Sequence, residues 1–186
     1  MARLVLIGLG VLAITVNTLA QIPQPAPPGP HEAALAAAPA AMKDGAMVIK
    51  WKADGSYETL RPGTNRLVCF DKSGLPGQLP FSIECSSIGN MDRITQNMRF
   101  ESETDRPKRQ AALDAAEKDG SRAKPEFGSI FYHLMGQDQA TARTHFTVAV
   151  PGATAASLGL PDSPKMGGVW IMNPGTSTAH LMLPGE

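Results

Sequence analysis

Two cysteines, Cys69 and Cys85, place the strongest constraint on how this chain can fold. They are the only cysteines among 186 residues, and they enclose a stretch rich in glycine and proline. A bond between them would close a loop of about 15 residues, for which chain entropy predicts about 3 kcal/mol of stabilisation. A redox or metal-binding pair is the alternative, but the spacing is not Cys-x-x-Cys, and no histidine lies within ten residues of either cysteine. We therefore expect a structural disulfide bond, Cys69–Cys85.

The first twenty residues have the pattern of a signal peptide, which fits a disulfide-bonded protein. Arg3 gives a positive start, residues 4–12 are almost wholly apolar, and the small residues Thr18 and Ala20 precede a cleavage point before Gln21. A transmembrane anchor is the alternative, but polar residues interrupt the apolar run before it reaches the length of about 20 that a span requires. We expect an exported mature protein, periplasmic or secreted, with no integral membrane span after cleavage.

Charge and composition narrow the classes of function further. Without residues 1–20, sixteen Lys and Arg face seventeen Asp and Glu, a net charge of about −1. So balanced a chain has no long-range field to attract nucleic-acid phosphates, and we expect no nucleic-acid partner. The 18 glycines and 16 prolines favour a loop-rich fold over a helical bundle. We divide the chain into a signal peptide (1–20), a Pro-rich linker (21–30) and a single α+β domain (31–186).

Within the domain, the apolar pattern predicts both helices and strands. Residues 46–70 hold three alternating runs separated by turn signals at Asp54-Gly55 and Pro62-Gly63, which predicts three short antiparallel strands. Glycine and proline make residues 71–84 irregular, and Asn90 is a candidate N-cap. The other expected elements are helices over residues 31–42, 90–102 and 107–119 and strands over residues 128–136, 145–150, 169–172 and 179–183. The predicted fold is α+β, a mainly antiparallel sheet with two or three helices and one disulfide.

Three histidines on expected strands, His133, His145 and His180, are the main candidates for chemistry. Such residues can converge on a metal ion, but their separations of 12 and 35 residues match no metal-binding motif. A buried neutral imidazole requires no function, whereas a general base requires a nucleophile and an orienting carboxylate such as Asp71 or Asp138. The chain has neither a Gly-x-Ser-x-Gly elbow nor a P-loop. We predict no cofactor and no metal site, and we assign no catalytic residue.

The order of several short stretches resembles a group of small exported bacterial proteins of uncharacterised function. These stretches are Leu60-Arg61, Gly63-Thr64-Asn65, Cys69, Cys85, Tyr132-His133-Leu134-Met135-Gly136 and Ala179-His180-Leu181-Met182. The group tends to show Leu-Arg-x-Gly-x-Asn-Gly-Trp-x-Cys, Tyr-Met-Leu-x-Gly-Gly and Pro-His-hydrophobic-Met. Here Arg66 and Leu67 stand in place of Gly-Trp, and Ala179 stands in place of the proline. The resemblance implies no catalytic residue, but it implies that His180, Tyr132 and the Arg61–Asn65 turn share one surface.

These observations favour a binding function over catalysis. We expect an exported soluble module that binds a small ligand or an envelope protein, with Arg61, Asn65, Tyr132, His133 and His180 as the candidate binding residues. One alternative is a hydrolase or metal-dependent enzyme that uses His133, His145 and His180. A second alternative is a structural protein of the cell envelope.

Overall fold

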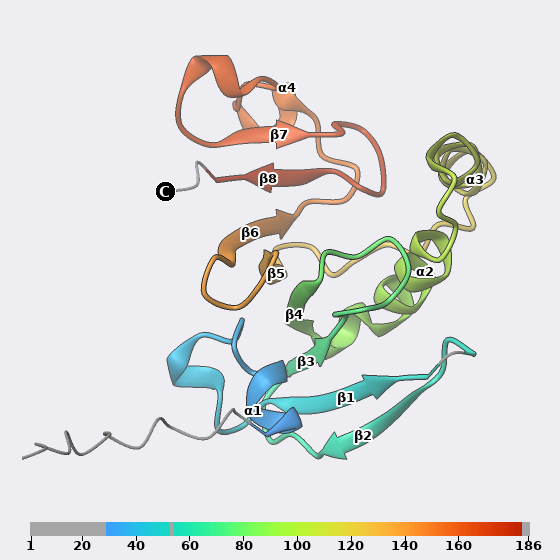
Figure 1. Ribbon diagram of the computed structural model, residues 1–186. Coiled ribbons are helices and arrows are strands. Elements are labelled where there is room, and N and C mark those ends of the chain that lie inside the picture. Colours follow the sequence, from blue (N-terminus) through green and yellow to red (C-terminus); the bar gives the residue numbers. More distant parts are fainter. Residues whose placement is uncertain (1–28, 53, 184–186) are drawn as a thin grey trace, which may run out of the picture.

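The computed structural model describes residues 29–52 and 54–183 (Figure 1). The expected signal peptide (1–20) and all but the end of the expected linker (21–30) lie outside the described residues. No helix in the described part of the chain is long and apolar enough to cross a membrane.

An eight-stranded mixed sheet of order β2-β1-β3-β4-β5-β6-β8-β7 forms the centre of the fold. The strands are β1 (Met47–Trp51), β2 (Tyr57–Arg61), β3 (Leu67–Asp71), β4 (Phe81–Ser87), β5 (Ile130–Gly136), β6 (Arg143–Ala149), β7 (Trp170–Met172) and β8 (His180–Met182). All neighbouring pairs of described strands are antiparallel except β1 and β3, which are parallel. The prediction of an α+β fold with one disulfide is therefore confirmed, but the sheet is mixed.

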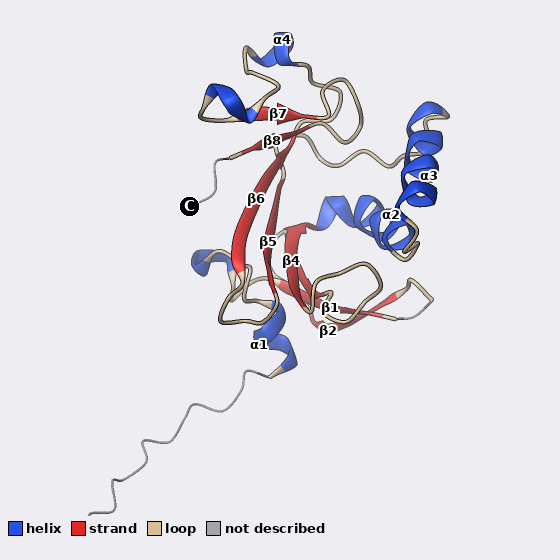
Figure 2. Ribbon diagram, turned by 45° about the horizontal axis from the view of Figure 1, so that its top comes forward, coloured by secondary structure: helices blue, strands red, loops and turns tan. Residues whose placement is uncertain are grey.

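Helices lie on both faces of this sheet (Figures 1 and 2). The α-helices are α1 (Pro30–Ala34), α2 (Met91–Glu101), α3 (Arg106–Lys118) and α4 (Ala155–Leu158), and 3-10 turns cover Ala40–Met42, Ile88–Asn90 and Pro164–Met166. Four α-helices exceed the two or three expected, because α4 was not predicted; α1 is also shorter than the helix expected over residues 31–42. On β1, Val48 packs in the core that contains Ala34 of α1, whereas Ile49 packs in the core that contains Ile94 of α2. Adjacent residues of a strand point to opposite faces, so α1 and α2 cover opposite faces.

The expected antiparallel meander over residues 46–70 is wrong in its third strand. β1 and β2 form the expected hairpin, but β3 pairs with β1 in parallel instead of with β2. The chain crosses the start of β1 after β2, because the backbone amides of Thr64 and Asn65 both donate to the Gly45 carbonyl, at 2.8 and 3.0 Å. Gly63 allows this crossing: a Cβ there would lie 2.7 Å from the Met47 nitrogen. These long-range contacts place β3 on the other side of β1.

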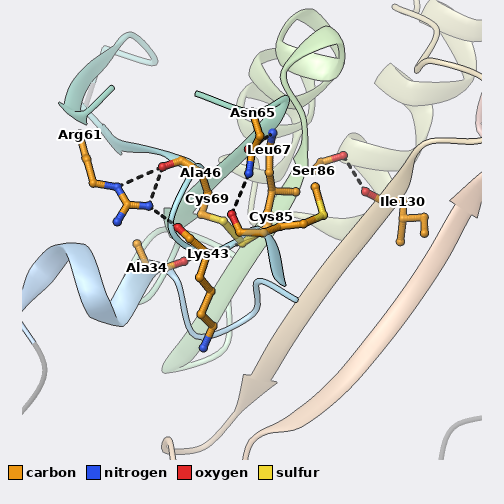
Figure 3. The surroundings of a disulfide bond; sticks show 11 residues. Ala34, Lys43, Ala46, Arg61, Asn65, Leu67, Cys69, Cys85, Ser86 and Ile130 are labelled. Carbon is orange, nitrogen blue, oxygen red and sulfur yellow. Dashed lines mark hydrogen bonds between the residues drawn. A yellow bond between two sulfur atoms is a disulfide. The ribbon is translucent and has the colours of Figure 1, made fainter. Parts of the chain in front are cut away.

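The disulfide Cys69–Cys85 is confirmed, and it joins two neighbouring strands (Figure 3). Residues 71–84 were expected to be irregular, but Phe81 begins β4, in which Cys85 lies directly opposite Cys69 of β3. Both cysteines are fully buried beneath α1. The bond therefore locks a β-hairpin instead of closing a loop between two separate regions.

Asn90 attaches the start of α2 to the sheet. It directly precedes the helix as expected, but its fully buried side chain does not cap it. The Asn90 amide group donates to the hydroxyls of Ser86 and Ser129, at 2.8 and 2.9 Å, and its oxygen accepts from the Glu126 amide at 2.8 Å. These bonds hold α2 over β4 and β5.

We predict that the double variant Cys69→Ala/Cys85→Ala folds but loses about 3 kcal/mol, because the unfolded chain regains the freedom of a loop of about 15 residues. In a chain of this size the midpoint of thermal unfolding would fall by about 6–12 °C. Calorimetry would test this, with mass spectrometry before and after reduction to count free thiols. Two free thiols in the protein before reduction would contradict the assignment.

Candidate functional site

A cleft of about 380 Å³ lies between α2 and one face of β4, β5 and β6. Its floor consists of side chains at alternate positions of these strands, because alternate residues of a strand share one face. The floor residues are Ser82, Glu84, Phe131, His133, Met135, Thr147 and Ala149. The walls are formed by α2, by the loop over residues 77–79 and by the segment that leads into β8. The face of β5 that carries His133 therefore forms part of the floor of a cavity large enough for a small molecule.

A buried cluster of charges lies at one end of the cleft. The Lys72 ammonium is 3.1 Å from Glu84 Oε2 and 2.9 Å from Glu101 Oε2. Lys72 is 7% exposed and Glu84 is 4% exposed. Three elements contribute to the cluster, because Lys72 directly follows β3, Glu84 belongs to β4 and Glu101 ends α2. Gln78 donates to Glu101 at 2.7 Å and connects the cluster to the loop that forms a wall.

The two innermost members of this cluster keep each other charged. Burial alone would lower the pKa of Lys72, but the nearby carboxylates of Glu84 and Glu101 outweigh it and raise this pKa above its usual value. Burial alone would raise the pKa of Glu84, but the charges of Lys72 and His133 outweigh it and lower that pKa. An ammonium and a carboxylate therefore face the cleft at neutral pH.

His133 extends the cluster across the sheet. It lies opposite Glu84 in the register of β4 and β5, and its Nδ1 is 3.5 Å from Glu84 Oε2. Burial lowers the pKa of His133; Glu84 opposes this effect, whereas Lys72 and His145 add to it. The imidazole is therefore neutral at pH 7, and it can both donate and accept a hydrogen bond. The carboxylate beside it is Glu84, not the Asp71 or Asp138 considered from the sequence.

The other two histidines lie on the same side of the sheet. His180 lines the cleft, and its Nδ1 lies 2.7 Å from the Thr178 carbonyl. Because a carbonyl only accepts, Nδ1 donates in this contact, and in that tautomer of the imidazole Nε2 is an acceptor. His145 lies opposite His133, with the two rings 5.9 Å apart. Within the described residues, no group of three His, Cys, Asp or Glu side chains is placed to hold a metal ion.

The remaining candidate residues lie away from the cleft. The Arg61 guanidinium donates to the carbonyls of Lys43 and Ala46, and Asn65 donates to the Met42 carbonyl at 2.8 Å (Figure 3). Both side chains hold the segment before β1 in place. Tyr132 points to the opposite face of β5 from His133, where it packs against Phe146 and the core beneath α1. The structure therefore brings His133 and His180 to one cleft and leaves Arg61, Asn65 and Tyr132 elsewhere.

Sequence reasoning missed Lys72, Glu84, Glu101 and Arg93, which supply most of the charge in the cleft. A signal for Glu84 was present in residues 81–87, where Ser82, Glu84 and Ser86 alternate with apolar residues. Lys72, Glu101 and Arg93 carried no comparable signal, because their burial depends on contacts between separate elements.

The loop wall approaches α2 closely at Gly77. This residue has a φ of 75°, and a Cβ there would lie 2.7 Å from the Glu101 carbonyl oxygen. Gly74 in the same loop has a similar φ of 76°, but a Cβ there would meet nothing within 4 Å. The two glycines therefore separate the effect of backbone conformation from that of the close approach.

We predict that Gly77→Ala destabilises the protein more than Gly74→Ala does. Both variants place a side chain at positive φ, which costs about 1–2 kcal/mol. Only Gly77→Ala also pushes the loop away from α2, which adds about 1–3 kcal/mol. Urea unfolding of both variants measures the difference, and equal losses would show that the wall does not depend on this contact.

We predict that the free energy of unfolding falls as the pH drops below about 6.5, the usual pKa of histidine. The unfolded chain takes up a proton there, whereas the folded protein, with its lowered His133 pKa, does not. His133→Gln should flatten this dependence, and His31→Gln, at an exposed position of α1, should preserve it. Urea titrations at pH 7.5, 6.5 and 5.5 measure the slope, and identical slopes in all three proteins would contradict the prediction.

Glu84, whose pKa is also lowered, adds a further loss of folding free energy below about pH 4.5.

Comparison of the chain with protein-family models, curated proteins and solved structures found no match. The resemblance to small exported bacterial proteins therefore stays a prediction. The geometry of the cleft is the basis for the function proposed below.

Proposed function

We propose that the protein binds a small polar ligand in the cleft between α2 and strands β4–β6, without chemical conversion. The observation that carries the proposal is the cluster of buried Lys72 and Glu84 with the partly exposed Glu101, which lines one end of a cavity of about 380 Å³. Cavities of roughly 300–1,000 Å³ with a few convergent polar groups are typical of small-molecule sites.

The cost of burying charges supports a ligand over a purely structural role. Removing an ion from water costs several kcal/mol, and a buried ion pair is often no more stabilising than apolar residues of the same size. Here Lys72 and Glu84 line a cavity, together with the neutral His133 and the acceptor Nε2 of His180. Donors, acceptors and both signs of charge thus converge on one space, which fits a ligand that carries hydrogen-bonding groups of both kinds.

Catalysis with His133 as a general base is the second candidate, and the position of Glu84 beside Nδ1 favours it. A base acts on a substrate or on a nucleophile within hydrogen-bond reach. No serine, threonine or cysteine in the described part of the chain forms a hydrogen bond with His133, so binding without catalysis is the better supported function.

Because disulfides persist in oxidising compartments, we also propose that binding takes place outside the cytoplasm.

The proposal is tested by filling the cleft. Thr147→Phe places a large side chain on the cavity floor, and Thr144→Phe places it at an exposed position on the other face of β6. The probes are a defined panel of amino acids, dicarboxylates, sugars and sugar phosphates, screened by thermal unfolding. A compound at 100 times its dissociation constant stabilises by about 2.7 kcal/mol, which raises the unfolding midpoint by about 5–10 °C.

We expect at least one class of compound to stabilise the wild type and Thr144→Phe but not Thr147→Phe. Calorimetric titration of that compound then measures its affinity, and chromatography of the mixture shows whether it is converted. The proposal is overturned if no compound stabilises the wild type, or if stabilisation is equal in both variants. Conversion that is lost in His133→Gln would favour the enzyme instead.

A further inference from the structure

The cleft continues into a second recess beside α3. This recess has a volume of about 390 Å³. The residues that it shares with the cleft are Gly77, Gln78, Arg93, Asn97, Glu101 and Thr178. Three arginines from separate parts of the chain line it: Arg93 of α2, Arg109 of α3 and Arg122 of the following loop. We call the space lined by these three residues the arginine recess. Because it shares six lining residues with the cleft, one molecule can occupy both.

Two of the three guanidinium groups are buried. Arg93 is 4% exposed and Arg122 is 7% exposed, although arginine is almost always exposed in folded proteins unless it is paired. Arg93 donates to the Ala123 carbonyl and to the hydroxyls of Ser177 and Thr178, and Arg122 donates to the side-chain oxygens of Gln96 and Asn97. All of these acceptors are neutral, so no hydrogen-bond partner of either guanidinium carries a negative charge.

The nearby carboxylates of Glu117 and Glu101 act on the arginines through space, but their direct hydrogen bonds and ion pairs are with other residues. Glu117 accepts hydrogen bonds from the backbone amide and the hydroxyl of Ser177, and Glu101 pairs with Lys72. Within the described residues, no carboxylate forms an ion pair with Arg93, Arg109 or Arg122. Arg122 Nε is buried and has no hydrogen-bond partner there either.

Burial and the charge of Arg122 both act on the guanidinium of Arg93. Burial and the positive charge of Arg122 lower the pKa of Arg93 to about 10, although Glu117 opposes this shift. Two like charges that destabilise each other gain from a negative charge placed between them. A planar guanidinium also matches the two oxygens of a carboxylate or a phosphate, so it binds such groups strongly.

We propose that the arginine recess binds the oxyanion end, a carboxylate or a phosphate, of the ligand that occupies the cleft. The inference rests on the function proposed above, and it narrows the class of ligand. The other end of such a molecule reaches Lys72, Glu84 and His133, where hydroxyl or ammonium groups find acceptors. The ligand class is therefore a small hydroxy acid, amino acid or sugar phosphate, and not an uncharged or a purely cationic molecule.

Arg109 is the best residue for the test, because it is only half-buried. Within the described residues its side chain makes one hydrogen bond, to the Glu103 carbonyl, which is long at 3.4 Å. Arg109→Gln removes one charge from the recess, and Arg106→Gln removes the same charge from an exposed position three residues earlier in α3. The probes are succinate and inorganic phosphate, titrated by calorimetry into the wild type and both variants. Comparing the two anions shows whether a carboxylate or a phosphate is preferred.

We expect one of the two anions to bind the wild type and Arg106→Gln equally, and to bind Arg109→Gln about tenfold or more weakly. Absence of binding by both anions, or an equal loss in both variants, would overturn the inference.

The variant Thr147→Phe distinguishes failure of this inference from failure of the proposed function. Suppose that Thr147→Phe abolishes stabilisation by panel compounds, but Arg109→Gln binds both anions as the wild type does. The proposal for the arginine recess is then wrong, and the proposed binding in the cleft stands. Suppose instead that Arg109→Gln weakens binding of an anion, but Thr147→Phe changes stabilisation by no panel compound. Anion binding in the recess then stands, and the proposed function of the cleft is wrong.

Discussion

The pairing of β3 with β4, locked by Cys69–Cys85, is the constraint on which the rest of the structure depends. Side chains of a strand alternate between two faces, so a slip of one residue would exchange every side chain of β4 between them. The covalent bond fixes Cys85 beneath α1 and therefore fixes Glu84 on the side of α2. Lys72 follows β3 by one residue, so the same register sets the distance between its ammonium and the Glu84 carboxylate.

The two faces of the sheet carry different chemistry. Beneath α1, Val48, Leu67, Ile83 and the two cysteines form an apolar core, whose burial provides the main driving force for folding. Beneath α2, the apolar core consists of residues of β1 and β3 together with Ile94 of α2, Phe131 of β5 and Ala149 of β6. The centre of this face carries charged groups, histidines and hydroxyls. Such a division makes one face responsible for stability and frees the other for recognition.

The sequence predicted local features well and long-range features poorly. Alternation located β1 and β6, an apolar run located β5, and the helical pattern located α2 and α3 to within a few residues. The parallel pairing of β1 with β3 depends on the amides of Thr64 and Asn65 reaching Gly45, a contact that no local pattern encodes. β4 was missed because the dense glycine and proline signals before residue 80 dominated the interpretation. Arg61 was a candidate binding residue because the resemblance implied that its turn shares a surface with Tyr132 and His180, but its guanidinium donates to backbone carbonyls.

The disulfide also has a consequence for how such a protein can diverge. In an ordinary hairpin, the side chains that face each other help to specify which residues pair, so changes at these positions endanger the fold. Because the covalent bond fixes the register, the cleft-facing residues of β4, Ser82 and Glu84, are not required to specify which residues pair. Ser82 can therefore change while the strands stay aligned, and Glu84 can change together with its partner Lys72. Descendants of one ancestral hairpin could in this way recognise chemically different molecules on an unchanged scaffold.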